Sequence, residues 1–168
     1  MAGMSDEPYI RTAVISDDGL YRYRLERVWD DARPALPFVM LNPSTADALV
    51  DDPTIRRCVG FARRENAGGI IVCNLYAFRA TSPADLWKAR DPYGPQQDDE
   101  LRTLSEYALL TGMPIVCGWG IHGGSWNKPI IMLQTHSPNL ACLGRTKDGK
   151  PRHPLYVRAD QPLEGFLT

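Results

Sequence analysis

The sequence predicts an α/β fold: a three-layer sandwich around a central, mainly parallel four-stranded sheet, with an antiparallel hairpin at the N-terminus. Short apolar runs bounded by turn residues recur along the chain, as is typical of buried parallel strands. Segments with apolar residues at helical spacing lie between these runs. Strands that alternate with helices form a parallel sheet covered on both faces. The chain has 168 residues, of which 43% are hydrophobic. We therefore expect one domain with a substantial core over residues 1–168.

The first half of the chain predicts a hairpin, two core strands and the helix between them. Strand-forming runs lie on either side of Asp17, Asp18 and Gly19, which have the composition of a tight turn. Asp52 and Pro53 are typical of an N-cap and a first helical position, and apolar residues follow them at helical spacing, opposite a row of arginines. The expected ranges are 9–15 and 20–28 for the hairpin, 38–41 and 69–73 for the core strands, and 53–65 for the helix.

The second half predicts two further helices and the last two core strands. Ser82 and Pro83 begin a short helix, and apolar residues at helical spacing define a longer one. The apolar run 130–133 fits a helix or a strand. The expected ranges are 83–88 and 96–110 for the helices, 114–118 and 140–144 for the strands, and 119–127 and 145–155 for loops.

The overall charge argues against a protein that coats nucleic acid. The net charge is −1 and the pI is about 6.3, although a local basic face is still compatible with these values. Residues 1–8 lack a signal-peptide pattern, and no apolar run approaches the ~18 residues of a membrane span. We expect a soluble, cytoplasmic protein with no membrane partner.

The cysteines and histidines do not have the spacing of a metal centre. Cys58, Cys73, Cys117 and Cys142 are far apart in apolar surroundings, with no Cys-x-x-Cys pair. The three histidines are equally scattered, and no matching carboxylate pattern accompanies them. We expect buried free thiols in a reducing compartment, no metal and no other cofactor.

Polar residues follow the predicted core strands where these strands end. Asn42 follows the first core strand, Asn74 follows the second, and His153 lies in the Gly- and Lys-rich loop after the last. The carboxyl ends of strands in an open α/β sheet form its ligand crevice, so we expect the two amides to converge there. An amide can hold a water or a carbonyl group, and a histidine can donate to a developing anion. Asx-turns and a solvated loop are the structural alternatives.

Neighbouring residues extend this candidate site. Ser44 and Thr45, in the loop of Asn42, are candidates for substrate contact. Tyr76 and Phe78 are candidates for stacking on a nucleobase, although aromatic residues after a strand are more often core residues. The candidates for phosphate contact are Arg79, Lys147, Lys150 and Arg152.

Three aspartates follow the loop of Asn42. Asp47, Asp51 or Asp52 can activate a water molecule, or all three can serve as solvated and helix-capping residues. The spacing alone does not choose among them.

Two blocks of the sequence resemble a bacterial and phage family catalogued as a domain of unknown function (number 1643). The blocks are Leu41 to Asp47 with Asp51 to Thr54, and Asn74 to Thr81. The resemblance spans about residues 20 to 157, and this family name implies no activity.

A more distant resemblance does imply an activity. Met40 to Ser44 is similar to the water-activating Gly-x-Asn-Pro-Ser loop of the uracil-DNA glycosylase superfamily, but without the leading glycine. Val72 to Tyr76 resembles the strand of some branches that ends in Ile-Thr-Asn, and His153 to Leu155 resembles their His-Pro-Ser loop, with leucine for serine. The resemblance implies that Asn42 positions the attacking water, Asn74 reads the flipped base and His153 stabilises the departing base anion.

The leading hypothesis is a monomeric, metal-independent DNA glycosylase with a uracil-DNA-glycosylase-like domain. It would flip a pyrimidine, with or without a phage-type modification, out of DNA and hydrolyse the N-glycosidic bond, in DNA repair or anti-phage defence. A hydrolase of free nucleotides or nucleosides and a non-catalytic nucleic-acid binding module are the two alternatives. Substrate length separates the two enzymes, and turnover separates both from the binding module.

Overall fold

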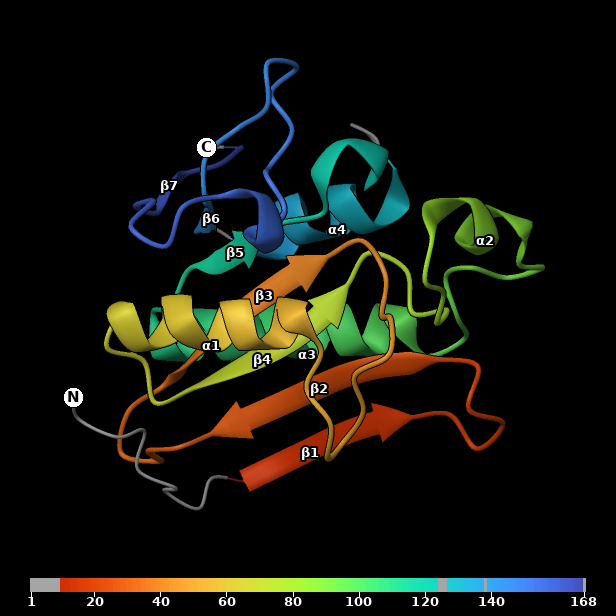
Figure 1. The fold of residues 1–168 in the computed structure, drawn as a ribbon, viewed down its shortest axis with the longest axis horizontal. Helices are drawn as coiled ribbons and strands as arrows, with labels where there is room; N and C mark the ends of the chain where they lie inside the picture. Colours follow the sequence, from red (N-terminus) through yellow and green to blue (C-terminus); the bar gives the residue numbers. More distant parts are fainter. Residues whose placement is uncertain (1–9, 124–126, 138, 168) are drawn as a thin grey trace.

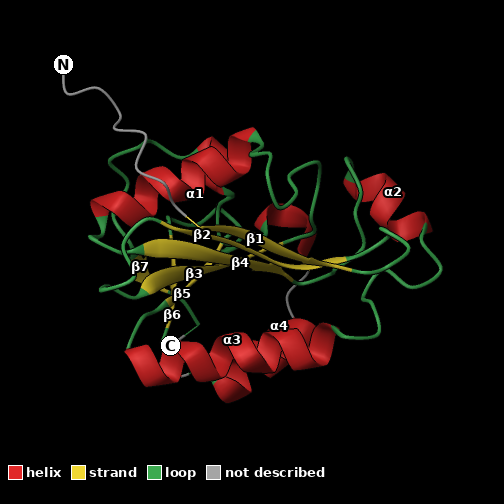
Figure 2. Ribbon diagram, turned by 90° about the horizontal axis from the view of Figure 1, so that it is seen from below, coloured by secondary structure: helices red, strands yellow, loops and turns green. Residues whose placement is uncertain are grey.

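The computed structural model describes residues 10–123, 127–137 and 139–167, which form a seven-stranded sheet with helices on both faces (Figures 1 and 2). The strand order is β1-β2-β4-β3-β5-β6-β7. The strands are β1 (Ile10–Ile15), β2 (Arg22–Val28), β3 (Ala35–Met40), β4 (Gly69–Asn74), β5 (Ile115–Cys117), β6 (Leu140–Cys142) and β7 (Glu164–Gly165). The helices are α1 (Pro53–Arg64), α2 (Pro83–Lys88), α3 (Gln97–Thr111) and α4 (Lys128–His136), with 3-10 turns at Gly120–Gly123 and Pro154–Tyr156.

Only the centre of the sheet is parallel. Strands β4, β3, β5 and β6 run parallel to one another, whereas β1, β2 and β7 pair antiparallel at the two sides. The predicted α/β class, parallel centre and N-terminal antiparallel hairpin are confirmed. The sheet is wider than predicted because β7 adds a strand; its two residues are too few to give a strand pattern in the sequence.

The first core strand begins earlier than predicted, at Ala35 in place of Phe38. The prolines at 34 and 37 indicated a connector. Pro37 nevertheless pairs with Ile71 of β4. This is possible because β5 pairs with β3 only at Phe38 and Val39, so the missing N–H of Pro37 interrupts no ladder on that side.

Two apolar clusters pack against the sheet, with α1 on one face and α3 and α4 on the other (Figure 2). On one face, α1 buries Ile55, Cys58 and Phe61 against strand residues such as Phe38 and Val72. On the other face, α3 and α4 bury leucines and isoleucines against the same strands. The run 130–133, which fitted a helix or a strand, belongs to α4, whose N-cap Asn127 accepts a hydrogen bond from the N–H of Ile130.

All four cysteines are buried free thiols, as the sequence predicts. Burial raises the pKa of the Cys73 thiol to about 12, so this group stays protonated at neutral pH. Over the described ranges, no helix combines the length and the apolar character that crossing a bilayer requires.

Candidate functional site

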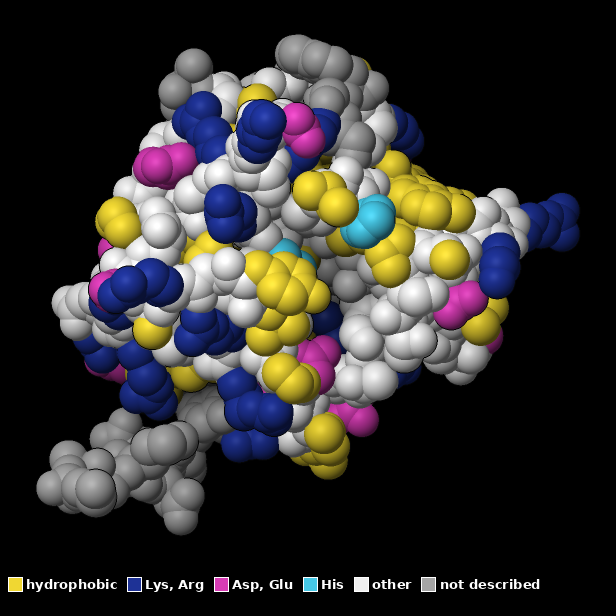
Figure 3. Space-filling view, turned by 45° about the horizontal axis from the view of Figure 1, so that its top comes forward, with side chains coloured by type: hydrophobic (Ala, Val, Ile, Leu, Met, Phe, Trp, Pro, Cys, Tyr) yellow, Lys and Arg dark blue, Asp and Glu magenta, His cyan; other side chains and the backbone are white. Residues whose placement is uncertain are grey.

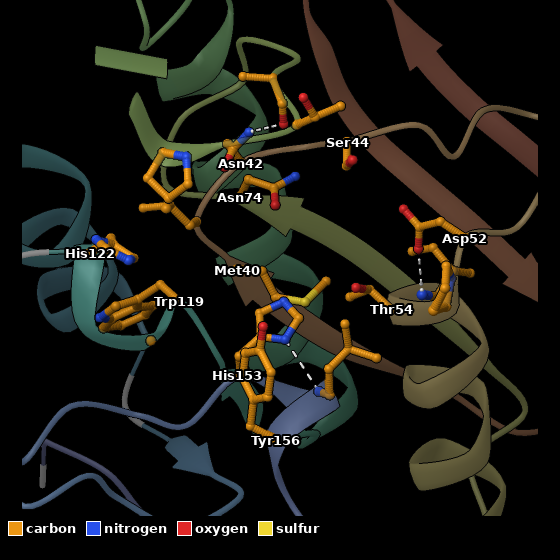
Figure 4. Close-up of a pocket in the computed structure, with 18 of the residues that line it drawn as sticks. Met40, Asn42, Ser44, Asp52, Thr54, Asn74, Trp119, His122, His153 and Tyr156 are labelled. Carbon is orange, nitrogen blue, oxygen red and sulfur yellow. Dashed lines mark hydrogen bonds between the residues drawn. The ribbon is translucent and has the colours of Figure 1, made fainter. Parts of the chain in front are cut away.

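A cavity of about 680 Å³ opens at the carboxyl ends of β3 and β4 (Figure 4). Asn42, Asn74 and His153 all line it, although they come from three distant segments of the chain. In Figure 4 the two amides lie together on one side of the opening, and His153 lies across from them, near Met40. The convergence expected from the sequence therefore exists in the fold.

Asn42 uses one half of its amide to hold the loop that carries it. Its Nδ2 donates to the carbonyl oxygens of Ala80, at 2.8 Å, and Pro43, at 3.0 Å. The backbone adds a third contact, from the N–H of Ala80 to the carbonyl of Pro43, at 3.0 Å. Because Nδ2 is engaged twice, Oδ1 is the atom that can accept a hydrogen bond from a ligand or a water.

Asn74 ends β4 next to Met40 of β3, and the residue is only 2% exposed. Its backbone carbonyl accepts a hydrogen bond from the Nε2 of Gln97, at the start of α3. Among the residues that the structure describes, its side-chain Nδ2 has no hydrogen-bond partner. Buried amide groups are nearly always paired, so this donor is available to something that enters the cavity.

His153 carries its proton on Nε2. The backbone N–H of Leu155 donates to His153 Nδ1 at 3.2 Å, which requires a lone pair on that nitrogen. Burial lowers the pKa of His153, against a smaller opposing effect of the Asp52 charge. At neutral pH the side chain is therefore a neutral imidazole whose Nε2–H can donate.

Two glycines allow the loop of His153 to approach the end of β5. A Cβ on Gly118 would lie 3.1 Å from the Pro154 ring, closer than most real contacts. Gly120 has a φ of 68°, which a side chain would disfavour, and its N–H donates to the Pro151 carbonyl at 2.9 Å. The segment after β5 thereby fixes the position of His153.

Of the three aspartates after the Asn42 loop, only Asp52 lines the cavity. It caps α1, and its Oδ1 accepts from the N–H of Ile55 at 2.9 Å. Asp47 instead accepts from two backbone N–H groups of its own loop, and Asp51 pairs with Arg27. The structure thus leaves Asp52 as the carboxylate that can act on a ligand.

Two buried arginines of β2 support the loop between β3 and α1. Arg22 donates through Nη1 to the Ala46 carbonyl at 2.6 Å. Arg27 donates through Nη2 to the Asp47 carbonyl at 2.7 Å and forms a 2.8 Å ion pair with Asp51. Arg22 also lines the cavity, so it is both a support and part of the site.

Some predicted substrate residues lie in the cavity and others do not. Ser44 and Thr45 line it. Tyr76 packs edge-on against Trp87, with a ring separation of 5.0 Å, and its hydroxyl accepts from Asn127. Phe78 packs against the core on the α3 side of the sheet. The structure therefore does not bring Tyr76 and Phe78 to the cavity, because tertiary packing turns both rings elsewhere.

The predicted cationic residues divide in the same way. Arg152 lines the cavity, and its Nε donates to the Arg145 carbonyl at 2.9 Å. Lys147 and Lys150 lie in the hairpin-like loop before it, which the Arg145–Pro151 bridge closes. Arg79 lies beside Ser44 in a shallower hollow adjoining the cavity. Of the four, Arg152 forms part of the cavity wall, Arg79 lines the adjoining hollow, and the two lysines belong to the loop that leads to Arg152.

Two arginines of α1 contact the C-terminal segment of the chain. Arg57 donates to the carbonyls of Pro154 and Val157, and Arg64 donates to those of Ala159 and Gln161. These two side chains are therefore engaged by the protein itself.

Exposed apolar side chains surround the mouth of the cavity. Figure 3 shows hydrophobic side chains gathered around a hollow on this face of the molecule. Tyr156 is 78% exposed, and Ile121 and Leu155 are exposed beside it. The Tyr156 and His153 rings lie 5.7 Å apart. An apolar rim of this kind is suited to contact with a partner or substrate.

Sequence reasoning missed Arg22, Trp119 and Tyr156 as cavity residues. Arg22 falls in a strand pattern in which an arginine is expected to face solvent, and the sequence predicts Trp119 only as the first residue of the loop 119–127. Tyr156 lies three residues past His153, and that proximity was the one available signal.

Within the described part of the chain, no three His, Cys, Asp or Glu side chains gather closely enough to hold a metal ion. Comparison with curated proteins and with solved structures gives no match. Comparison with family models does give one, over residues 22–155. The chain belongs to the family described as protein of unknown function (DUF1643).

Proposed function

We propose that this protein is a DNA glycosylase that hydrolyses the N-glycosidic bond of a flipped base. The observation that carries the proposal is the meeting of Asn42, Asn74 and His153 in one cavity of about 680 Å³. That volume is in the range of small-molecule sites and can hold a single nucleoside. The order of these residues along the chain also matches the resemblance to the uracil-DNA glycosylase superfamily.

The chemistry follows from which atoms are free. Asn42 Oδ1 accepts a hydrogen bond from a water, which attacks C1′ of the sugar as the bond between C1′ and the base nitrogen breaks. The bonding electron pair goes to the base. His153 Nε2–H donates to a base oxygen on which charge develops, and Asn74 Nδ2 donates to the base edge. The proton lost by the water finally protonates the base.

Asp52 is the carboxylate that can assist the attack. Its charge favours the positive charge that develops on the sugar, and its second oxygen can accept a proton from the water. Asp47 and Asp51 are occupied by their own contacts.

The apolar rim of the cavity favours a macromolecular substrate over a small one. Exposed Leu155 and Tyr156 lie two and three residues after His153, so a duplex docked over the cavity would meet apolar side chains that can fill the space of an extruded base. Lys147, Lys150, Arg152 and Arg79 around the cavity provide phosphate contacts.

A hydrolase of free nucleotides or nucleosides is the second candidate. Arg57 and Arg64 of α1 donate to the protein's own carbonyls. Because these contacts leave fewer cations of α1 for DNA phosphates, they favour this candidate.

The test is a release assay analysed by mass spectrometry. The protein is incubated with genomic DNAs that carry different natural base modifications and, in parallel, with the corresponding nucleosides and nucleotides. A DNA glycosylase releases a free base from at least one DNA and leaves the monomers intact. Release from monomers alone supports the second candidate. Binding to DNA without release of any base would instead favour the non-catalytic module.

A further inference from the structure

Arg22 is a buried cation in the wall of the cavity, and the glycosylase mechanism above gives it no role. The residue is only 2% exposed. Burial lowers the pKa of Arg22 to about 10, so the guanidinium is still protonated at neutral pH.

A β-bulge directs Arg22 toward the cavity. Ile15 of β1 pairs with Arg22 and Val14 pairs with Arg24, so β2 carries Tyr23 as an extra residue between them. Arg24 faces Glu100 of α3, and regular alternation would send Arg22 to that same face. Its guanidinium instead donates to Ala46, in the cluster under α1. Bulges commonly redirect a side chain in this way beside functional sites.

The protein itself provides hydrogen-bond acceptors for only some of the donors of the Arg22 guanidinium. Nη1 donates to the Ala46 carbonyl, whereas the buried Nε has no hydrogen-bond partner among the described residues. Within the same described set, no carboxylate lies at ion-pair distance from Arg22; the Asp52 charge attracts it from farther away. A buried charge in this state is costly unless a ligand compensates it.

A second residue of the cavity wall also has an unpaired buried donor. Asn74 Nδ2 also lacks a partner among the described residues, and Asn74 is as buried as Arg22. Two unpaired donors, one of them cationic, match a group that carries acceptor oxygens and negative charge.

We propose that Arg22 is a substrate-binding residue that, with Asn74, holds an anionic, oxygen-bearing group of the substrate inside the cavity. This inference rests on the proposed function, in which that group is the departing base. The negative charge that develops on the base oxygens as the bond breaks is then stabilised by Arg22 as well as by His153. The same chemistry fits the phosphate of a free nucleotide, and the experiment distinguishes the two sources.

The experiment measures binding by calorimetry at pH 8 with three probes: uracil, 5-nitrouracil and inorganic phosphate. The nitro group acidifies the ring, so 5-nitrouracil binds as an anion, whereas uracil is neutral. We expect the wild-type protein to bind 5-nitrouracil more tightly than uracil. Arg22→Gln should weaken 5-nitrouracil binding ~10-fold or more, the effect of losing a charge-assisted hydrogen bond, with little effect on uracil.

Two further variants keep the test decisive. Arg24→Gln removes a charge from the same strand on the opposite face of the sheet, so its affinities should equal those of the wild type. Arg22→Lys retains the charge but replaces the planar guanidinium, whose donors lie on three nitrogens, with a single ammonium nitrogen, and it should show an intermediate loss even if Arg22→Gln fails to fold.

The phosphate arm separates this inference from the proposed function. One outcome is that phosphate binds the wild type, that neither pyrimidine competes with it, and that Arg22→Gln loses phosphate binding. Arg22 is then an anion-binding residue, but the substrate is a nucleotide and the glycosylase proposal fails. The inference itself is overturned if no anion binds the wild type, or if folded Arg22→Gln and Arg22→Lys bind both anions as the wild type does.

Discussion

One ring nitrogen of His153, Nδ1, accepts a hydrogen bond from the backbone. Because Leu155 N–H donates to Nδ1, protonation of that nitrogen would break the contact as well as charge a buried ring. Burial lowers the pKa of His153 from its ordinary value of 6.5. The working form in our mechanism is therefore the neutral imidazole, with the proton on Nε2.

The pH dependence of base release should show this. We expect a flat rate from pH 8 down to about 6.5 and a fall below it, as His153 becomes protonated. Since the folded pKa lies below the unfolded one, the unfolded state takes up the proton first as pH falls. His153 should therefore reduce stability from about pH 6.5 downward, through the folded pKa, and not above it. Rates and melting temperatures measured across this range check both statements.

Matched variants assign the effect to this residue. His153→Ala should slow base release about 10² to 10³-fold and cost at most about 1 kcal/mol of stability, for the lost cap on the turn that follows. His136→Gln alters an exposed histidine of α4, which bonds to its own helix, and should keep the wild-type pH profile. An unchanged rate in His153→Ala would return the residue to an ordinary loop position.

At the scale of elements, the position of the loop between β3 and α1 depends on side chains of β2. Arg27 is fully buried and ties the loop through Asp51 and the Asp47 carbonyl. This loop carries Asn42, Ser44 and Thr45, so the geometry of the site depends on a contact that lies outside the cavity.

Asp51→Ala should destabilise the protein by about 3 kcal/mol, because it leaves a buried guanidinium without its carboxylate. The amides of Leu49 and Val50, which bond to Asp47 in this loop, should exchange faster with solvent. Urea unfolding and hydrogen exchange measure the two effects. The control is Asp160→Ala, which removes an ion pair exposed on both sides and should change stability by no more than about 0.5 kcal/mol. Equal effects of the two variants would show that the Arg27–Asp51 contact is not a support.

The elements also show what the sequence can and cannot predict. The proximity of Asn42 and Asn74 could be predicted from the sequence. The end of each apolar run marks the end of a strand, and the carboxyl ends of neighbouring parallel strands meet at one edge of the sheet. Arg22 could not be found, since its direction depends on a bulge that breaks the two-residue alternation. Tyr76 and Phe78 follow Asn74 in sequence, yet packing against Trp87 and Tyr21 decides where their rings lie.

At the scale of the whole molecule, the cavity lies where the cationic loop between β6 and the turn at 154–156 meets the ends of β3 and β4. With a net charge of −1, DNA binding has to depend on this local group of cations. The same arrangement predicts that affinity is sensitive to salt.

DNA affinity should fall steeply as salt increases. If Arg79, Lys147, Lys150 and Arg152 each neutralise one phosphate, the slope of log affinity against log salt should be about −3 to −4, and Lys147→Gln should reduce its magnitude by about one. Arg102→Gln, on α3 across the sheet, should leave the slope unchanged. Fluorescence anisotropy with a labelled duplex measures these slopes. An affinity independent of salt, or none for DNA of any length, would favour the enzyme of free nucleotides.

The most direct test of the central claim compares Asn42 variants on a DNA that yields a free base, with single-turnover release and DNA affinity measured on the same samples. Asn42→Ala removes the acceptor that holds the water, so release should slow by about 10² to 10⁴-fold while DNA affinity stays near wild type. The two loop hydrogen bonds of Nδ2 are lost as well, so stability should fall by about 1 to 2 kcal/mol with the protein still folded. Asn42→Asp keeps an acceptor oxygen and loses the donor to Ala80 and Pro43, so it should retain more release than the alanine variant. Release that persists at the wild-type rate in folded Asn42→Ala would contradict the account, because the cavity would then not be the place where the bond is broken.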